Sequence, residues 1–97
     1  MKLHLTEQAP NQIAAINAYL VVRSPLGAGN VQLAMQATFA QLANFPGLGR
    51  RQRTTGLRKL GVGRFPYNVY YSVDEQADEI IIISVRHASR APRFFNA

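Results

Sequence analysis

The first half of the chain changes from a strand-like pattern to a helical one. Residues 2–5 alternate polar and apolar side chains, which predicts a short strand. A first helix is then predicted by apolar residues that recur at helical spacing, namely Ile13, Ile16, Leu20 and Val21. We expect this helix to end near Val22. It begins either after Thr6, a candidate N-cap, or nearer Ala9, because Pro10 favours the first helical position.

A second helix is predicted directly after the first. Ser24 is a candidate N-cap and Pro25 suits the first helical position, but two following glycines weaken that turn and move the expected regular helix to Asn30. The buried face is marked by one apolar stripe, formed by Val31, Ala34, Met35, Thr38, Phe39 and Leu42. Pro46-Gly47 ends the helix, and the short connection between the helices predicts an antiparallel hairpin.

The second half of the chain follows the two-residue period of strands. We expect strands at 57–62, from Phe65 or Tyr67 to Val73, and at 79–85, with residues 74–78 as a turn. The last strand is apolar on both faces, as expected near the centre of a sheet. The pattern predicts one α+β domain over residues 1–97, of order β-α-α-β-β-β, with the helical hairpin packed on a small antiparallel sheet.

Composition narrows the function classes. The 97 residues include 47% hydrophobic and 16% charged residues, which indicates a globular chain rather than a disordered one. No apolar run is long enough to span a membrane, and the first residues lack the apolar stretch of a signal peptide. Cysteine is absent, which excludes disulfides, thiol catalysis and cysteine-based zinc sites. We therefore expect a cytoplasmic protein that needs no membrane, metal or cofactor.

The charge is strongly asymmetric. Eleven Lys and Arg against five Asp and Glu give a net charge of +6. Four of the five acids fall within residues 74–79, so the rest of the chain carries eleven bases and only Glu7. Such a surface attracts polyanions or an acidic protein through its long-range field. The alternative is a solvated face that only keeps the protein soluble.

The densest basic segment is 50–64. It holds six bases and no acid, namely Arg50, Arg51, Arg53, Arg58, Lys59 and Arg64. Because part of the segment is a predicted strand, these side chains would lie along one edge of the sheet. One interpretation is a track for phosphates or carboxylates. The other is an edge strand protected from aggregation by its charges, and the sequence leaves both open.

A second basic group follows the last predicted strand, with Arg86, His87, Arg90 and Arg93. A histidine beside arginines suggests a nuclease, with the histidine as general acid or base and arginine stabilising phosphate charge. No second proton-transfer group is placed with it, so a hydrogen-bonded structural role for His87 is favoured. Two histidines without cysteine do not form a metal-ligand pattern.

Several segments together resemble a known family. Leu57–Leu60, Gly63–Asp74 with its Pro-Tyr-x-x-x-Tyr strand, the 80–90 segment with its Arg-His-x-x-Arg ending, and the Phe45–Arg50 turn closely resemble the RelE/ParE superfamily of toxins from bacterial type II toxin–antitoxin modules. The resemblance covers nearly the whole chain. It implies the same β-α-α-β-β-β fold that the periodicity predicts.

The superfamily has two activities, and the resemblance bears on the choice. RelE-like members cut messenger RNA in the ribosomal A site, whereas ParE-like members poison DNA gyrase. Where RelE-like toxins have arginine, arginine and tyrosine, this chain has Asn68, Ala88 and Phe94. Phenylalanine cannot transfer a proton as tyrosine can. The Arg-His-x-x-Arg ending is more similar to the ParE branch, while His87 keeps the ribonuclease alternative open.

The resemblance also implies partners and surfaces. A cognate acidic antitoxin would neutralise the toxin in a hetero-oligomer, with antitoxin contacts at Arg50, Arg51 and Arg53. Binding of the target, DNA gyrase, is expected at Arg58, Lys59, Arg64, Arg86 and Arg90. His87 would be catalytic only in a ribonuclease that acts on the ribosome and messenger RNA. A basic RNA-binding module without toxicity is the third alternative.

Overall fold

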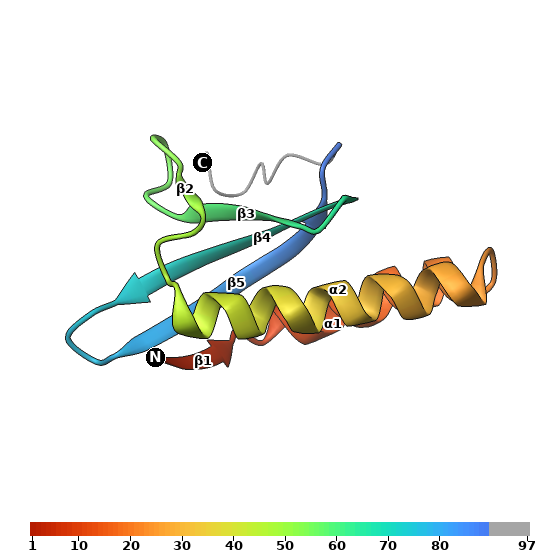
Figure 1. Cartoon of the computed structure of the whole chain (residues 1–97). Coiled ribbons are helices and arrows are strands. Elements are labelled where there is room, and N and C mark those ends of the chain that lie inside the picture. Colours follow the sequence, from red (N-terminus) through yellow and green to blue (C-terminus); the bar gives the residue numbers. More distant parts are fainter. Residues whose placement is uncertain (90–97) are drawn as a thin grey trace.

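The chain folds into a helical hairpin packed against one face of a five-stranded sheet (Figure 1). The computed structural model describes residues 1–89, so the expectations placed on Arg90, Arg93 and Phe94 lie outside the described residues. The elements are β1 (Lys2–Leu5), α1 (Gln8–Val21), α2 (Pro25–Asn44), β2 (Arg50–Arg51), β3 (Arg58–Val62), β4 (Phe65–Asp74) and β5 (Glu79–His87).

The order of the sheet is β1-β5-β4-β3-β2. β3, β4 and β5 form the predicted antiparallel meander, β2 adds an antiparallel edge, and β1 lies parallel to β5. The predicted α+β fold with a helical hairpin on a small antiparallel sheet is therefore confirmed, with the difference that β1 pairs with β5 in parallel. β2 was not predicted, because a strand of two residues is too short to show an alternating pattern.

The core lies between the helices and the inward face of the sheet. Tyr67, Val69 and Tyr71 of β4 are buried there, because alternate residues of a strand lie on the same face. The predicted stripe of α2 supplies the opposite wall, with Val31, Met35, Thr38 and Leu42 buried. Leu33 lies outside the stripe and is 65% exposed.

A side chain caps the N-terminus of α2 but not that of α1. Ser24 caps α2 as predicted, because its Oγ accepts a hydrogen bond from the Gly27 amide (2.9 Å). With that cap and with Pro25 at the first position, the regular helix begins at Pro25 and not at Asn30, where it was expected. The expected cap at Thr6 is wrong. α1 starts without a side-chain cap, and the Thr6 hydroxyl is used elsewhere.

A bulge interrupts the pairing of β4 with β5. Tyr70 lies opposite Ser84, but the next residue, Tyr71, lies opposite Ile82. Ile83 is therefore the extra residue that has no partner across the ladder. Because side chains alternate along a strand, one extra residue reverses the faces of everything that follows it in β5.

Polar side chains at the start of α1 bind the edge of β5 at this bulge. The carbonyl oxygen of Ile83 accepts hydrogen bonds from Thr6 Oγ1 (2.7 Å) and Gln8 Nε2 (2.8 Å). Two residues later, the Val85 amide donates to Gln12 Oε1 (2.8 Å). β1 ends at Leu5, which pairs with Ile82, so it offers no backbone partner to the residues of β5 beyond Ile82. The side chains of Thr6, Gln8 and Gln12 take the place of that backbone partner, so Ile83 and Val85 remain hydrogen-bonded.

Candidate functional site

The sheet face opposite the helices, here called the distal face, carries two of the predicted target-binding residues. Two adjacent cross-strand rows lie on it. The first contains Arg50, Lys59, Tyr70 and Ser84, and the second contains Gly61, Asn68 and Arg86. Lys59 and Arg86 are both half-buried, and Tyr70 is buried at 7% exposure. The structure therefore brings Lys59 and Arg86 together around two polar residues of β4.

The bulge in β5 decides which side chains join this face. Without the extra residue Ile83, strict alternation from Ile82 would place Ser84 and Arg86 toward the helices and His87 on the distal face. With it, Arg86 pairs with Asn68 on the distal face, and His87 turns to the helix side. The predicted cluster of Arg86 with His87 is thus divided between the two faces of the sheet.

His87 has the contacts of a structural residue. It lies opposite Tyr67 in the ladder, and the two rings meet edge to face with centroids 5.5 Å apart. Its Nδ1 accepts a hydrogen bond from the Ser89 amide (3.1 Å) and lies 2.8 Å from the Ser89 hydroxyl. An Nδ1 that accepts places the proton of the neutral ring on Nε2.

His87 and Tyr67 form one wall of a cleft of about 600 Å³ between α1 and the ends of β4 and β5. The α1 wall is mostly apolar, and the complete lining is Ala15, Ile16, Tyr19, Leu20, Pro66, Tyr67, His87 and Ser89. Burial, and after it the nearby Tyr19 phenol, raises the pKa of Tyr67 above its usual 10.0. Tyr67 therefore remains a protonated phenol at neutral pH.

Part of the basic segment, Arg50, Arg51, Arg58 and Lys59, forms the β2–β3 edge of the sheet, so the expected edge position holds for these four bases. Arg50 lies directly opposite Lys59, and Arg51 lies directly opposite Arg58. Like charges in directly opposed positions destabilise a sheet. Within residues 1–89, neither Arg50 nor Arg51 forms an ion pair with a carboxylate. The edge therefore presents positive charge that an acidic partner would neutralise.

The remaining predicted bases are not on the distal face. Arg58 is on the helix side, where its Nη1 donates to the Gly49 carbonyl (2.8 Å). Arg64 is exposed in the β3–β4 turn, and Arg53 is exposed in the loop between β2 and β3. The predicted bases therefore divide among the distal face, the β2–β3 edge and the turns.

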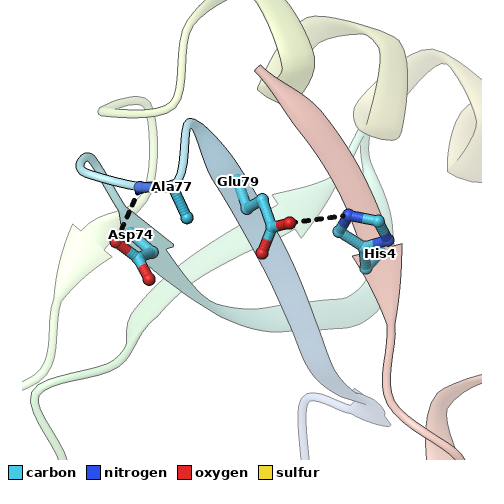
Figure 2. A network of polar contacts seen from close by, with 4 residues as sticks. All are labelled: His4, Asp74, Ala77 and Glu79. Carbon is cyan, nitrogen blue, oxygen red and sulfur yellow. Dashed lines mark hydrogen bonds and ion pairs between the residues drawn. The ribbon is translucent and has the colours of Figure 1, made fainter.

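The acidic residues serve local structure at the β4–β5 turn (Figure 2). Asp74 Oδ1 accepts a hydrogen bond from the Ala77 amide (3.1 Å), which is ordinary turn chemistry. Glu79 Oε1 lies 3.3 Å from Nε2 of His4 on the neighbouring strand β1. Asp74 thus stabilises the β4–β5 turn, and Glu79 links β5 to β1.

Sequence reasoning missed one buried polar residue on the distal face. Ser84 is fully buried, and its Oγ has no hydrogen-bond partner among the described residues. Its signal was a single hydroxyl within the apolar run 80–85. The face it occupies could not be counted from the sequence, because the bulge precedes it by one residue.

Residues 1–89 bring together no three His, Asp or Glu side chains in a position to hold a metal ion. Neither α1 nor α2, the helices of this part of the chain, is long and apolar enough to cross a bilayer.

The comparisons with known proteins agree on one fold. The chain is similar to the chromosomal ParDE toxin–antitoxin system from P. aeruginosa, with 25% identity over 90% of this chain and 95% of that chain and a TM-score of 0.65. The isolated E. coli RelE toxin matches at 19% identity over 96% of this chain and 89% of that one, with a TM-score of 0.65. The intact E. coli RelBE toxin–antitoxin complex matches at 19% identity over 92% and 98%, with a TM-score of 0.67.

The sequence itself matches a family over most of its length. No curated protein sequence matches the chain. Residues 3–92 match the family described as "ParE toxin of type II toxin-antitoxin system, parDE". That range includes both helices and all the strands of the described sheet except the first residue of β1. The chain therefore belongs to the ParE toxins of type II toxin–antitoxin systems, within the RelE/ParE superfamily.

Proposed function

We propose that this ParE-family toxin arrests growth by acting on DNA gyrase and that a cognate acidic antitoxin neutralises it. The observation that carries the choice of target is the separation of His87 from the cations Lys59 and Arg86, which lie on the other face of the sheet. A ribonuclease that used His87 would need it beside the groups that stabilise phosphate charge. The distal face is better suited to binding an acidic surface than to cutting RNA through His87.

Asn68 supports the same choice. It lies beside Arg86 on the distal face, at the position where the resemblance to RelE-like toxins implies an arginine. An amide carries no charge and does not titrate, so it can donate a hydrogen bond to a phosphate oxygen but supplies no positive charge. At this position the distal face therefore has one base fewer than the resemblance to RelE-like toxins implies.

The antitoxin is proposed to bind the β2–β3 edge through Arg50, Arg51 and Arg53. The opposed like charges of this edge favour a partner that brings carboxylates. An acidic and partly disordered polypeptide supplies them along an extended path. The fold is shared with the RelBE toxin–antitoxin complex, which supports an antitoxin partner and a toxin–antitoxin hetero-oligomer for this chain.

A ribosome-dependent endoribonuclease is the second candidate. Tyr70 lies between Lys59 and Ser84 on the distal face, and a phenol beside a cation is able to take part in proton transfer. In this alternative the proton carrier is Tyr70 or His87, and the target is messenger RNA on the ribosome.

One comparison with purified protein separates the candidates. The toxin is titrated into a gyrase supercoiling assay and, separately, into ribosomes that carry a defined messenger RNA. We expect supercoiling to be inhibited and the messenger RNA to remain intact, with antitoxin reversing the inhibition. Ribosome-dependent cleavage without an effect on gyrase would establish the second candidate instead. RNA binding with neither activity would indicate the non-toxic basic module.

A further inference from the structure

The turn between α2 and β2 exposes two large apolar side chains, Phe45 at 62% and Leu48 at 48%. The Leu48 amide donates to the Phe45 carbonyl (3.2 Å), so these residues occupy the first and last positions of a β-turn. The Cα atoms of such positions lie within about 7 Å of each other. A Cβ built on Gly47 meets no atom within 4 Å, so the turn projects into open space. This protrusion is called the Phe45–Leu48 turn below.

Hydrogen bonds from side chains of the sheet fix the backbone of the Phe45–Leu48 turn. The phenol of the fully buried Tyr71 donates to the Pro46 carbonyl (2.8 Å) and accepts from the Gly49 amide (2.7 Å). From the neighbouring strand β3, Arg58 Nη1 donates to the Gly49 carbonyl (2.8 Å). Both ends of the turn are therefore fixed to the sheet, and the exposed side chains are presented on a preformed backbone.

The surroundings of this turn are positively charged. Arg50 and Arg51 follow it within three residues, and both are exposed. Arg51 lies opposite Arg58 on the helix side of the sheet, whereas Arg50 lies opposite Lys59 on the distal face. The sequence contains no Asp or Glu between Glu7 and Asp74, so residues 8–73 bring no carboxylate to this region. An apolar protrusion with an unneutralised basic border matches a partner that carries both apolar and acidic side chains.

A second exposed apolar group, at the tip of the helical hairpin, lacks this combination. At the tip of the helical hairpin, Val22 is 78% exposed and Leu26 is 77% exposed. The arginine between them, Arg23, donates to the Tyr19 carbonyl (2.7 Å), and its guanidinium lies 3.6 Å from the centroid of the Tyr19 ring. The hairpin tip thus exposes apolar surface beside a cation that is already engaged, and it provides a matched control.

We propose that the Phe45–Leu48 turn and the edge strand that follows it form one docking surface for the acidic antitoxin. The antitoxin follows this edge, where it meets Arg51 on the helix side of the sheet and Arg50 on the distal face. Apolar antitoxin residues cover Phe45 and Leu48, and antitoxin carboxylates meet the two arginines. This inference rests on the proposed function, because it assigns a site to the antitoxin named there. Because the turn is already rigid, the toxin loses little conformational entropy when it binds. Most of the entropy loss therefore falls on the partly disordered antitoxin, which orders on binding.

The two halves of the surface respond differently to salt, and this gives the test. The probe is the purified antitoxin encoded by the adjacent reading frame, titrated calorimetrically at low and at high ionic strength. Phe45→Ser with Leu48→Ser should weaken binding by about tenfold or more at both ionic strengths. Arg50→Gln with Arg51→Gln should weaken binding at low ionic strength and flatten its salt dependence, because salt screens exposed charges.

Val22→Ser with Leu26→Ser is the control, since it removes two apolar side chains at the hairpin tip that are more exposed than Phe45 and Leu48. It should leave the affinity unchanged. Circular dichroism should show all three double variants folded, because every substituted residue is exposed. Equal binding by wild type and the Phe45/Leu48 variant would overturn the docking surface while leaving the antitoxin partnership intact. Loss of binding in the control alone would also overturn it. Absence of binding by the wild type would instead refute the proposed partnership.

Discussion

The hydroxyl of Thr6 donates a 2.7 Å hydrogen bond to the carbonyl oxygen of Ile83, the extra residue of the β5 bulge. The bulge in turn sets the faces of Arg86 and His87. A residue that the sequence suggests as a helix cap therefore stabilises the strand geometry on which the distal face depends.

Replacing Thr6 with valine tests this relationship. Valine keeps the branched shape but removes the hydroxyl, so we expect the free energy of unfolding to fall by about 1 kcal/mol. Urea denaturation measures the change. Thr54→Val, at an exposed loop position, is the matched control and should change stability little. Equal stabilities for both variants would show that Gln8 alone satisfies the Ile83 carbonyl.

Gly49 and Gly47 form a second matched pair. A Cβ on Gly49 would lie 2.6 Å from the Tyr71 hydroxyl, and Tyr71 is fully buried. We therefore expect Gly49→Ala to destabilise the protein by about 1–3 kcal/mol, the usual cost of overpacking. Gly47 has open space and no left-handed backbone angle, so Gly47→Ala should be neutral or slightly stabilising. Thermal unfolding of both variants checks the contrast, and a stable Gly49→Ala protein contradicts it.

The stability of the fold should decline in alkali. Burial raises the pKa of Tyr71 above 10.0, against smaller opposing effects of the Gly49 hydrogen bond and of Arg58. The folded state thus keeps a proton that the unfolded state releases as the pH rises past about 10, so the free energy of unfolding falls there and not below.

Tyr71→Phe isolates this contribution. The variant should be less stable at neutral pH because it loses two hydrogen bonds, yet it should lose less further stability than wild type between about pH 9 and 11. Urea denaturation across this range gives both curves. Parallel curves would mean that Tyr71 does not contribute to the alkaline transition.

The distal face is tested by Lys59→Gln combined with Arg86→Gln. We expect this double variant to fold and to inhibit gyrase about tenfold or more weakly than wild type. Lys2→Gln removes a positive charge from β1, at the opposite edge of the sheet, and should have no such effect. Growth arrest on induction provides a second readout. Undiminished inhibition by a folded double variant would remove the distal face as the target-binding surface.

His87 separates the two toxin activities. Its ring packs against Tyr67 and bonds locally to Ser89, so His87→Gln should lower the unfolding temperature modestly and leave growth arrest intact. A folded His87→Gln variant that no longer arrests growth, together with messenger RNA cleavage by the wild type, would assign His87 a catalytic role.

Local patterns were sufficient for most of the fold. The apolar stripe of α2 predicted its buried face, because a helix must bury the side chains that recur at its own period. The two-residue period of β4 likewise puts Tyr67 and Tyr71 on one face of the strand, and the structure shows that this face lies in the core. The like-charged edge could also be anticipated, since Arg50 and Arg51 precede a predicted strand that itself begins with Arg58 and Lys59.

The sequence by itself therefore determined both helices and every strand of the described sheet except β2, the inward face of α2, and the excess of positive charge. Only the tertiary structure decided the faces of Arg86 and His87. They depend on one extra residue in β5, and that residue is accommodated because Thr6 and Gln8, more than seventy residues earlier in the chain, bind its carbonyl oxygen. A two-residue period cannot report such a shift, because the contact that permits it is distant in sequence and close only in the folded chain.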